Sequence, residues 1–383
     1  MGNIRYNTIG LMSGTSLDGV DAAILDTDGE QIFNFGATHF RPYTEAEKHT
    51  LHGATQAALA WNFTGPPPNI FSQAEQILHT AHIEAAQTLL KATEHKGRKI
   101  DLIGFHGQTV LHRPPENGQR GATLQLGNGQ VLADALGVDI IYDFRTNDVR
   151  EGGQGAPLAP LYHQALLAHS KLKRPAIVLN IGGVSNATLL EADGTVRASD
   201  CGPGNGPLDT WVKHCGRGDF DKDGHLSLAG TPDISRVEKW LDATFFTKPV
   251  PKSADRWDFD VLADMRGLSV QDGAATLVAF TAMAIQRTVN QYKTSNDPVA
   301  EAVIVCGGGR KNPAILAALK EQNIGTILTT EQTHWRGDDL EAEAFAYLAV
   351  RSVRGLPLST PETTGVSKSV SGGKRASAHP LKA

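Results

Sequence analysis

Three short glycine-rich segments, each following an apolar run, are the residues most suited to binding an anion. Turns that combine glycine with hydroxyl residues expose N–H and O–H donors, which match phosphate oxygens. None of the three is a GxxxxGK[ST] loop or a GxGxxG fingerprint, and one such turn alone is more often an ordinary hairpin turn. Three are hard to explain by folding alone, because glycine costs ~0.5–1 kcal/mol wherever it is not needed. We therefore predict a nucleotide site formed by Ser13-Gly14-Thr15-Ser16-Leu17-Asp18-Gly19-Val20, Asn180-Ile181-Gly182-Gly183 and Cys306-Gly307-Gly308-Gly309.

A single aspartate, Asp200, is the best candidate for proton transfer. It ends a predicted strand and stands directly before Cys201-Gly202-Pro203-Gly204, a turn that would hold its carboxylate rigidly. A carboxylate so placed can act as a general base that draws a proton from water or a hydroxyl. An Asx turn or the N-cap of a following helix is about as common for such an aspartate. Both interpretations stay open at this point.

Polar side chains after two further strands are suited to a sugar. Gln108 follows a buried strand and His106-Gly107, and neutral His and Gln groups match sugar hydroxyls, although a structurally bonded histidine is as common. Arg145 ends another strand and could hold a carboxylate in a bidentate manner or form a surface ion pair. Glu341 and Glu343 open the last predicted helix, where acidic residues favour the helix dipole whatever their function.

The composition excludes several classes of protein. The chain has 383 residues, 40% of them hydrophobic, enough for two domains that share a cleft. No run approaches the ~20 apolar residues that span a bilayer, and the start lacks a secretory pattern. The three cysteines include no CxxC pair, and the net charge of −5 argues against a general nucleic-acid binder. We expect a cytoplasmic protein with neither nucleic acid nor membrane as partner.

The elements that must position these residues form two successive cycles of strands and helices. In the first we predict strands at 9–12, 20–26 and 100–105, helices at 44–62 and 69–95, and a strand–helix–strand run over 123–145. After the glycine-rich connector 151–157, the second contains a helix at 158–169, a strand at 176–181, a hairpin ending at 199, a helix at 274–293, a strand at 302–306 and helices at 312–321 and 340–351. This order indicates a pair of α/β domains. The Ser/Lys/Gly-rich stretch from Val366 is expected to fray.

In their order along the chain, the motifs resemble those of the anhydro-N-acetylmuramic acid kinase family. Each motif is weak by itself, but the ordered set, from about residue 10 to residue 350, is highly specific. The matching segments are Gly10–Asp21, Gly107–Thr109, Asp143–Arg145, Gly152–Leu158, Asn180–Gly183, Asp200–Asn205, Cys306–Gly309 and Glu341–Ala349.

The resemblance implies an α/β fold with two ribonuclease-H-like domains of the actin, hexokinase and sugar-kinase type flanking a cleft. Residues 1–142 with 342–383 would form one domain, and residues 143–341 the other. The family uses ATP and Mg²⁺ to phosphorylate 1,6-anhydro-N-acetylmuramic acid and opens its anhydro bridge with water, which gives N-acetylmuramic acid 6-phosphate and ADP during murein recycling. It also implies a homodimer, although no interface can be identified from the sequence.

Roles for single residues follow from the same resemblance. Ser13 to Val20 would be the ATP phosphate loop, and Gly182, Gly183 and Gly307 to Gly309 would complete the nucleotide site. Asp200 would be the base that activates water, and Gln108, Arg145 and Glu341 would line the sugar pocket. Many actin-like ATPases open the first loop with Asp-x-Gly, whereas here it opens with Gly10-Leu11-Met12 and its acid comes later, as Asp18. We therefore assign no metal ligand.

Two other functions fit much of the same pattern. One is another sugar kinase of the same fold, which would transfer phosphate to an existing hydroxyl without consuming water. The other is a non-catalytic actin-like protein whose ATP state controls assembly. Asp200 before its Gly-Pro-Gly turn disfavours the second, because a filament needs no base on the sugar side.

Overall fold

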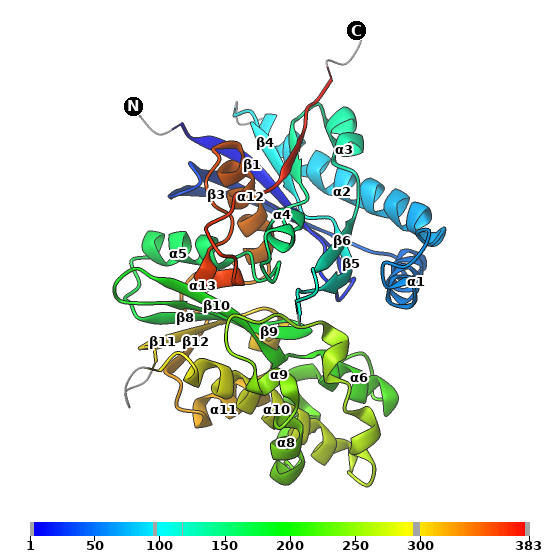
Figure 1. The fold of residues 1–383 in the computed structure, drawn as a ribbon, viewed down its shortest axis with the longest axis vertical. Coiled ribbons are helices and arrows are strands. Elements are labelled where there is room, and N and C mark those ends of the chain that lie inside the picture. Colours follow the sequence, from blue (N-terminus) through cyan, green and yellow to red (C-terminus); the bar gives the residue numbers. More distant parts are fainter. Residues whose placement is uncertain (1–3, 95–97, 117, 294–298, 380–383) are drawn as a thin grey trace. The chain divides into compact units, whose positions relative to one another are not determined.

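The computed structural model describes residues 4–94, 98–116, 118–293 and 299–379, and the chain divides into two compact units (Figure 1). Unit 1 comprises residues 1–170 and 339–383, and unit 2 comprises residues 171–338. The predicted domain division fell after residue 142 and after residue 341 instead. Residues 143–170 belong to unit 1 because their helices, α4 (Thr146–Arg150) and α5 (Pro160–His169), pack on elements of that unit.

Unit 1 is built on a six-stranded sheet in the order β13-β7-β4-β1-β2-β3. Strand β2 runs antiparallel to both of its neighbours, β1 and β3, whereas β4 and β7 run parallel to β1. Leaving out β13, this is a third-second-first-fourth-fifth order with the second strand reversed, which is the ribonuclease-H-like topology. The strands are β1 (Tyr6–Met12), β2 (Gly19–Thr27), β3 (Ile32–Pro42), β4 (Leu102–Phe105), β7 (Ile140–Tyr142) and β13 (Lys374–Ala376).

Helices cover both faces of this sheet. Ile9 and Leu11 of β1 belong to a buried cluster with residues of α1 (Glu45–Trp61) and α2 (Ile70–Glu94). Gly10, between them, faces α12 (Leu340–Val353) on the other side, since neighbouring residues of a strand point to opposite faces. These helices confirm the predictions, except that residue 95 lies outside the described residues. The unit also contains β5 (Gln108–Arg113), β6 (Ala122–Leu126), α3 (Gly129–Leu136) and α13 (Pro361–Thr364).

Two paired glycines let α12 lie directly on the sheet. Gly10 of β1 is opposite Gly104 of β4 in the parallel register. A Cβ atom on Gly10 would lie 1.8 Å from the carbonyl oxygen of Ala342, and one on Gly104 would lie 2.2 Å from that of Phe345. Only glycine fits at either position. The contact fixes the start of α12, which carries Glu341, against the strand that leads into the loop at Ser13.

Unit 2 has a five-stranded sheet in the order β10-β9-β8-β11-β12. Strand β9 is antiparallel to β8 and β10, and β11 and β12 run parallel to β8. The order is the same as in unit 1, so both units have the ribonuclease-H-like topology and the predicted fold class is confirmed. The strands are β8 (Ala176–Ile181), β9 (Val184–Leu190), β10 (Val196–Pro203), β11 (Ala302–Cys306) and β12 (Thr326–Thr329).

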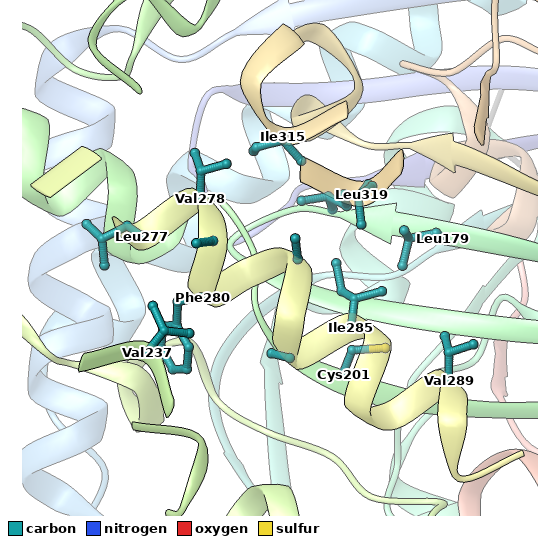
Figure 2. Close-up of a cluster of buried hydrophobic side chains, with 14 of the residues drawn as sticks. Leu179, Cys201, Val237, Leu277, Val278, Phe280, Ile285, Val289, Ile315 and Leu319 are labelled. Carbon is teal, nitrogen blue, oxygen red and sulfur yellow. The ribbon is translucent and has the colours of Figure 1, made fainter. Parts of the chain in front are cut away.

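Helix α10 (Val270–Asn290) forms the centre of the apolar core of unit 2. Figure 2 shows its Ile285 and Val289 beside Cys201 of β10, with Leu179 of β8 on the same side. No element was predicted between residues 216 and 269, where the structure has several short helices. The other helices of the unit are α6 (Gly206–His214), α7 (His225–Leu228), α8 (Ile234–Leu241), α9 (Thr244–Thr247) and α11 (Pro313–Glu321), with 3₁₀ turns at Lys222–Gly224, Arg256–Phe259, Leu262–Met265 and Gly308–Lys311.

In the part of the chain that the structure describes, no helix is both long enough and apolar enough to cross a bilayer.

The described part of the C-terminal stretch contains strand β13, so the prediction that this stretch frays is wrong. Strand β13 pairs antiparallel with β7, with Lys374 opposite Tyr142. Lys374 also forms an ion pair of 2.7 Å with Asp143, and Arg375 forms one with Asp139. The strand pairing and the ion pairs order a segment whose composition alone favours disorder. The sequence did not reveal this, because the partners of the segment lie far upstream in the chain.

We expect Gly10→Ala to lower the free energy of unfolding of unit 1 by about 1–3 kcal/mol, the usual range for overpacking. The new methyl group would force α12 off the sheet. Thermal denaturation of the full chain measures this change.

Gly53→Ala is the matched control. Its Cβ would meet only the flexible end of Ile70, at 2.9 Å, and alanine is favoured over glycine inside a helix by ~0.5–1 kcal/mol. Equal melting temperatures for the Gly10→Ala variant and the wild type would contradict the proposed close contact.

Candidate functional site

Of the predicted segment Ser13–Val20, residues 13–18 form the loop between β1 and β2, and Gly19 and Val20 begin β2. The apolar residue of the loop, Leu17, has a positive φ of 59° and is buried, and its N–H donates to the carbonyl of Gly14 at 3.2 Å. The side chains of Thr15, Ser16 and Asp18 are exposed. The turn is thus anchored by one side chain, while its hydroxyls and its carboxylate stay accessible.

Ser13 and Gln108, predicted for different parts of the site, are in direct contact. The Ser13 hydroxyl donates to Oε1 of Gln108 at 2.6 Å, and Nε2 of Gln108 donates to the Gly14 carbonyl at 3.2 Å. The Tyr43 hydroxyl lies 3.0 Å from that of Ser13. Burial raises the pKa of Tyr43 to about 12, so it is protonated at neutral pH and donates to Ser13. Gln108 therefore sets the shape of the loop.

Arg145 is held in place by a neutral histidine. The His106 Nδ1–H group donates to the Gly107 carbonyl at 2.8 Å, which leaves Nε2 to accept from Nε of Arg145 at 3.0 Å. Burial, followed by the charge of Arg145, lowers the pKa of His106 well below its usual value. Arg145 also donates from Nη1 to the carbonyl of Gly155 at 2.8 Å. Its guanidinium is fixed between the end of β4 and the glycine-rich connector.

The two glutamates at the start of α12 have different environments. Glu341 is exposed in the first turn. Glu343 is 1% exposed and accepts a hydrogen bond from the Tyr162 hydroxyl of α5. The sequence treated both as helix-start residues and missed the burial of Glu343. A carboxylate within the apolar run Ala342–Ala349 was the available signal.

Asp200 lies at an irregularity of β10, where the pairing with β9 shifts register before Gly202. It is 6% exposed, and its Oδ2 accepts from the N–H of Ala254 at 2.9 Å. Its own N–H donates to the carbonyl of Lys252 at 2.9 Å. The N-cap of α6 is Asn205, so Asp200 does not cap that helix. Sequence reasoning found Asp200 and missed the segment 252–254 that holds it.

Two of the three turns predicted for the nucleotide, those at Gly182 and Gly307, converge at the carboxyl ends of β8 and β11. Three N–H groups of one loop donate to two carbonyls of another. The N–H of Asn205 donates to the Gly182 carbonyl at 2.7 Å, and those of Gly204 and Gly206 donate to the Gly183 carbonyl at 3.0 and 3.2 Å. A Cβ on Gly204 would lie 2.2 Å from the Gly182 oxygen, so these backbones interlock without side chains between them.

The third turn packs on the same strand end. Gly307 has a φ of 71°, and a Cβ there would lie 2.3 Å from Oδ1 of Asn180, whereas one on Gly309 would lie 2.4 Å from Cγ2 of Ile181. Arg310, whose side chain is 3% exposed, donates to the Gly307 carbonyl at 3.0 Å and pairs with Glu331 and Asp338, each at 2.8 Å. The turn is rigid, and its neighbours are the turn at Gly182 and Asn205.

Comparison with known proteins decides what kind of protein carries this geometry. The sequence pattern described as anhydro-N-acetylmuramic acid kinase matches residues 6–377. The chain belongs to that family. A relative of this name from Mesorhizobium japonicum is 45% identical over 96% of this chain and 98% of its own. Relatives of the same name from Rhizobium rhizogenes and Caulobacter vibrioides are also 45% identical over 96% of this chain, and over 98% and 97% of their own.

Membership of the anhydro-N-acetylmuramic acid kinase family confirms the resemblance drawn from the motifs. Within unit 1, the structure brings Gln108 to the loop at Ser13 and Arg145 to His106. Within unit 2, it brings Gly182 and Gly183 together with Gly307 to Gly309. The functional roles of these residues stay predictions.

Buried neutral histidines should make unit 1 sensitive to acid. Burial lowers the pKa of His82 and His112 to about 4 and that of His163 to about 3. In the unfolded chain a histidine titrates near pH ~6.5. Below this pH these histidines bind a proton in the unfolded state but stay neutral in the folded state. Stability is fully present above pH ~6.5 and falls as the pH drops towards the folded values, by up to ~1.4 kcal/mol per pH unit for each histidine.

Thermal unfolding between about pH 7 and pH 5 measures this loss, at pH values above most carboxyl titration. We expect His82→Leu to reduce the slope by about one proton. The exposed His49, changed to leucine, is the control. A stability that does not depend on pH in this range would contradict the prediction.

Proposed function

We propose that this protein is an ATP-dependent kinase that phosphorylates O6 of 1,6-anhydro-N-acetylmuramic acid and opens the anhydro bridge with water. The products are N-acetylmuramic acid 6-phosphate and ADP. The observation that carries the proposal is the family match over residues 6–377, which includes every predicted site residue. The reaction belongs to murein recycling, and we place it in the cytoplasm because ATP is available there.

In this proposal, the glycine turns bind the nucleotide. Gly182, Gly183 and Gly307 to Gly309 present backbone without side chains to block a nucleotide, and the loop Ser13–Val20 offers N–H and O–H donors to the phosphates. Phosphoryl transfer depends on positioning and on charge stabilisation more than on covalent help. The interlocked backbones of unit 2 and the buried anchor Leu17 supply rigid positioning.

The residues of the first loop fit Mg²⁺. Among the described residues, three or more His, Cys, Asp or Glu side chains do not gather into a metal cage. Mg²⁺ does not need one, since it usually keeps several waters and takes one or two carboxylates together with substrate phosphates. The exposed Asp18, Thr15 and Ser16 offer such oxygen ligands. When bound with ATP, the ion neutralises charge on the phosphates.

Asp200 is proposed as the general base. Its carboxylate takes a proton from water while the water oxygen forms a bond to the anomeric carbon. The bond from that carbon to O6 breaks, O6 bonds to the γ-phosphorus, and the bond from phosphorus to ADP breaks. In a glycosidase, the second carboxylic acid protonates the leaving oxygen. Here the leaving oxygen bonds to the phosphoryl group instead, so no second carboxylic acid is needed. The hydrogen bond from Ala254 fixes one oxygen of Asp200, so its orientation is set before the water binds.

Three residues of unit 1 are proposed to form the sugar side of the site. Arg145, oriented by His106, suits the carboxylate of the substrate's lactyl group, because a guanidinium can bind a carboxylate with two hydrogen bonds. The exposed Glu341 suits its hydroxyl and amide groups, and Gln108, which is 1% exposed and bonded to Ser13 and Gly14, acts through the loop that it holds. A homodimer, as implied by the family resemblance, is part of the same proposal.

Asp200→Asn should lower kcat by about 10²–10⁴-fold, because it removes the base and leaves the backbone contacts of the turn unchanged. The assay combines ATP, Mg²⁺ and the anhydro sugar and follows ADP together with the mass of the phosphorylated sugar. Asp223→Asn is the control. Asp223 is exposed, is not one of the proposed site residues, and has a φ of 55° that asparagine tolerates.

ADP release by the wild-type protein without a phosphorylated sugar would overturn the assigned substrate. A sugar phosphate formed from another sugar without uptake of water would favour a different kinase of the same fold. ATP-dependent assembly without turnover would favour the non-catalytic alternative.

A further inference from the structure

Lys252 is a buried lysine of unit 2 that lies outside every helix and strand. The residue is 3% exposed, and its ammonium group donates to the carbonyls of Phe245 at 3.0 Å and Lys248 at 3.3 Å. The same group lies 4.6 Å from the ring centroid of Phe245. These carbonyls lie in and just after the short helix α9, and that of Phe245 also accepts from the N–H of Lys248 at 3.3 Å. The lysine therefore ties its own segment to the end of α9.

The backbone of the same residue contacts the strand that carries Asp200. The Lys252 carbonyl accepts from the N–H of Asp200 at 2.9 Å, and the Lys252 N–H donates to the hydroxyl of Ser199 at 3.1 Å. Two residues further on, the N–H of Ala254 donates to Oδ2 of Asp200 at 2.9 Å. The segment 252–254 thus forms hydrogen bonds with both the main chain and the side chain of Asp200.

The ammonium group ties this segment to a second element besides β10. Residues 252–254 lie in no helix and no strand ladder, so the segment is held by separate hydrogen bonds, those of its backbone to β10 and those of the ammonium group to the end of α9. Burying a charged group is costly unless it is satisfied, and here carbonyl dipoles and an aromatic face satisfy it. Burial lowers the pKa of Lys252 to about 8, with Cys201, Arg287 and Lys248 as the charged or titratable groups that act on it. The ammonium form prevails at neutral pH.

We propose that Lys252 is a positioning residue for the general base. It holds the segment 252–254 in place, and this segment orients the Asp200 carboxylate through the Ala254 N–H. The inference rests on the proposed function, in which Asp200 activates water. A small displacement of a reacting group can reduce the rate by ~10²-fold, so a residue that never touches the substrate can still control turnover.

Lys252→Met tests this role, because methionine keeps much of the apolar length and removes the ammonium group. Lys239→Met is the matched control, on the exposed side of α8. We expect the amides of Asp200 and Ala254 to exchange with solvent deuterium about tenfold faster in the Lys252 variant, because their local opening becomes easier. This measurement is made without substrate and does not depend on the identity of the sugar.

The kinetic effect should be confined to the step that uses Asp200. We expect kcat to fall by about 10- to 100-fold while the KM for ATP stays within about twofold. The acid limb of kcat/KM for the sugar should move to higher pH, because the lost Ala254 N–H bond had favoured the ionised carboxylate. Lys252→Gln, which keeps an N–H donor, should recover part of both effects.

Unchanged exchange at Asp200 and Ala254 would overturn the proposal. A lower melting temperature with an unchanged kcat and acid limb would overturn it too, since Lys252 would then only stabilise unit 2. Should the methionine variant not fold, the glutamine variant decides by the same readouts. If the wild-type protein does not phosphorylate the sugar, the proposed function fails, whereas the exchange experiment still decides whether Lys252 positions Asp200.

Discussion

Two backbones can lie against each other only where no side chain stands between them, and both units depend on such contacts. In unit 1, Gly10 and Gly104 let α12 rest directly on the middle of the sheet. In unit 2, Gly204 lies against Gly182, and the backbone of its loop donates hydrogen bonds to the carbonyls of Gly182 and Gly183. Since glycine loses more conformational freedom on folding than any other residue, these positions are costly. They bring strand ends, helix starts and exposed N–H groups into fixed geometry.

The candidate chemistry follows from what this geometry leaves accessible. Rigid turns in unit 2 surround the end of β8. The buried carboxylate of Asp200 lies in β10, and one of its oxygens accepts a hydrogen bond from Ala254. In unit 1, His106 stays neutral and so can accept from Arg145. Arg145 and Asp200 are thus each oriented by a second group, His106 and Ala254 respectively. A reaction that couples phosphorylation to bond opening by water needs this kind of orientation more than it needs many catalytic residues.

The sequence predicts the parts whose signal is local. The glycine turns after β8 and β11 and the helical periodicity of α2 were readable from neighbouring residues. The prediction that Asp200 ends its strand is wrong, because β10 continues through Pro203, paired with β9. The parts it missed depend on distant partners. The segment at Lys252 has no hydrophobic periodicity, and its contacts with Asp200 and Phe245 are made by residues far from one another in the sequence or without a local motif. The tail at Lys374 reads as disordered until β7 and Asp143 are placed beside it. The predicted division after residue 142 differs from the unit boundary after residue 170, because α4 and α5 pack on distant elements of unit 1.

The most direct test of the account is the fate of the oxygen from water. The reaction is run with ATP, Mg²⁺ and 1,6-anhydro-N-acetylmuramic acid in ¹⁸O-labelled water, and the product is weighed by mass spectrometry. We predict one ¹⁸O atom at the anomeric carbon and none in the phosphoryl group of the sugar phosphate, with both the label and the product lost in Asp200→Asn. A phosphorylated product with an intact anhydro bridge, or with ¹⁸O in its phosphoryl group, would contradict the coupled mechanism and the role of Asp200.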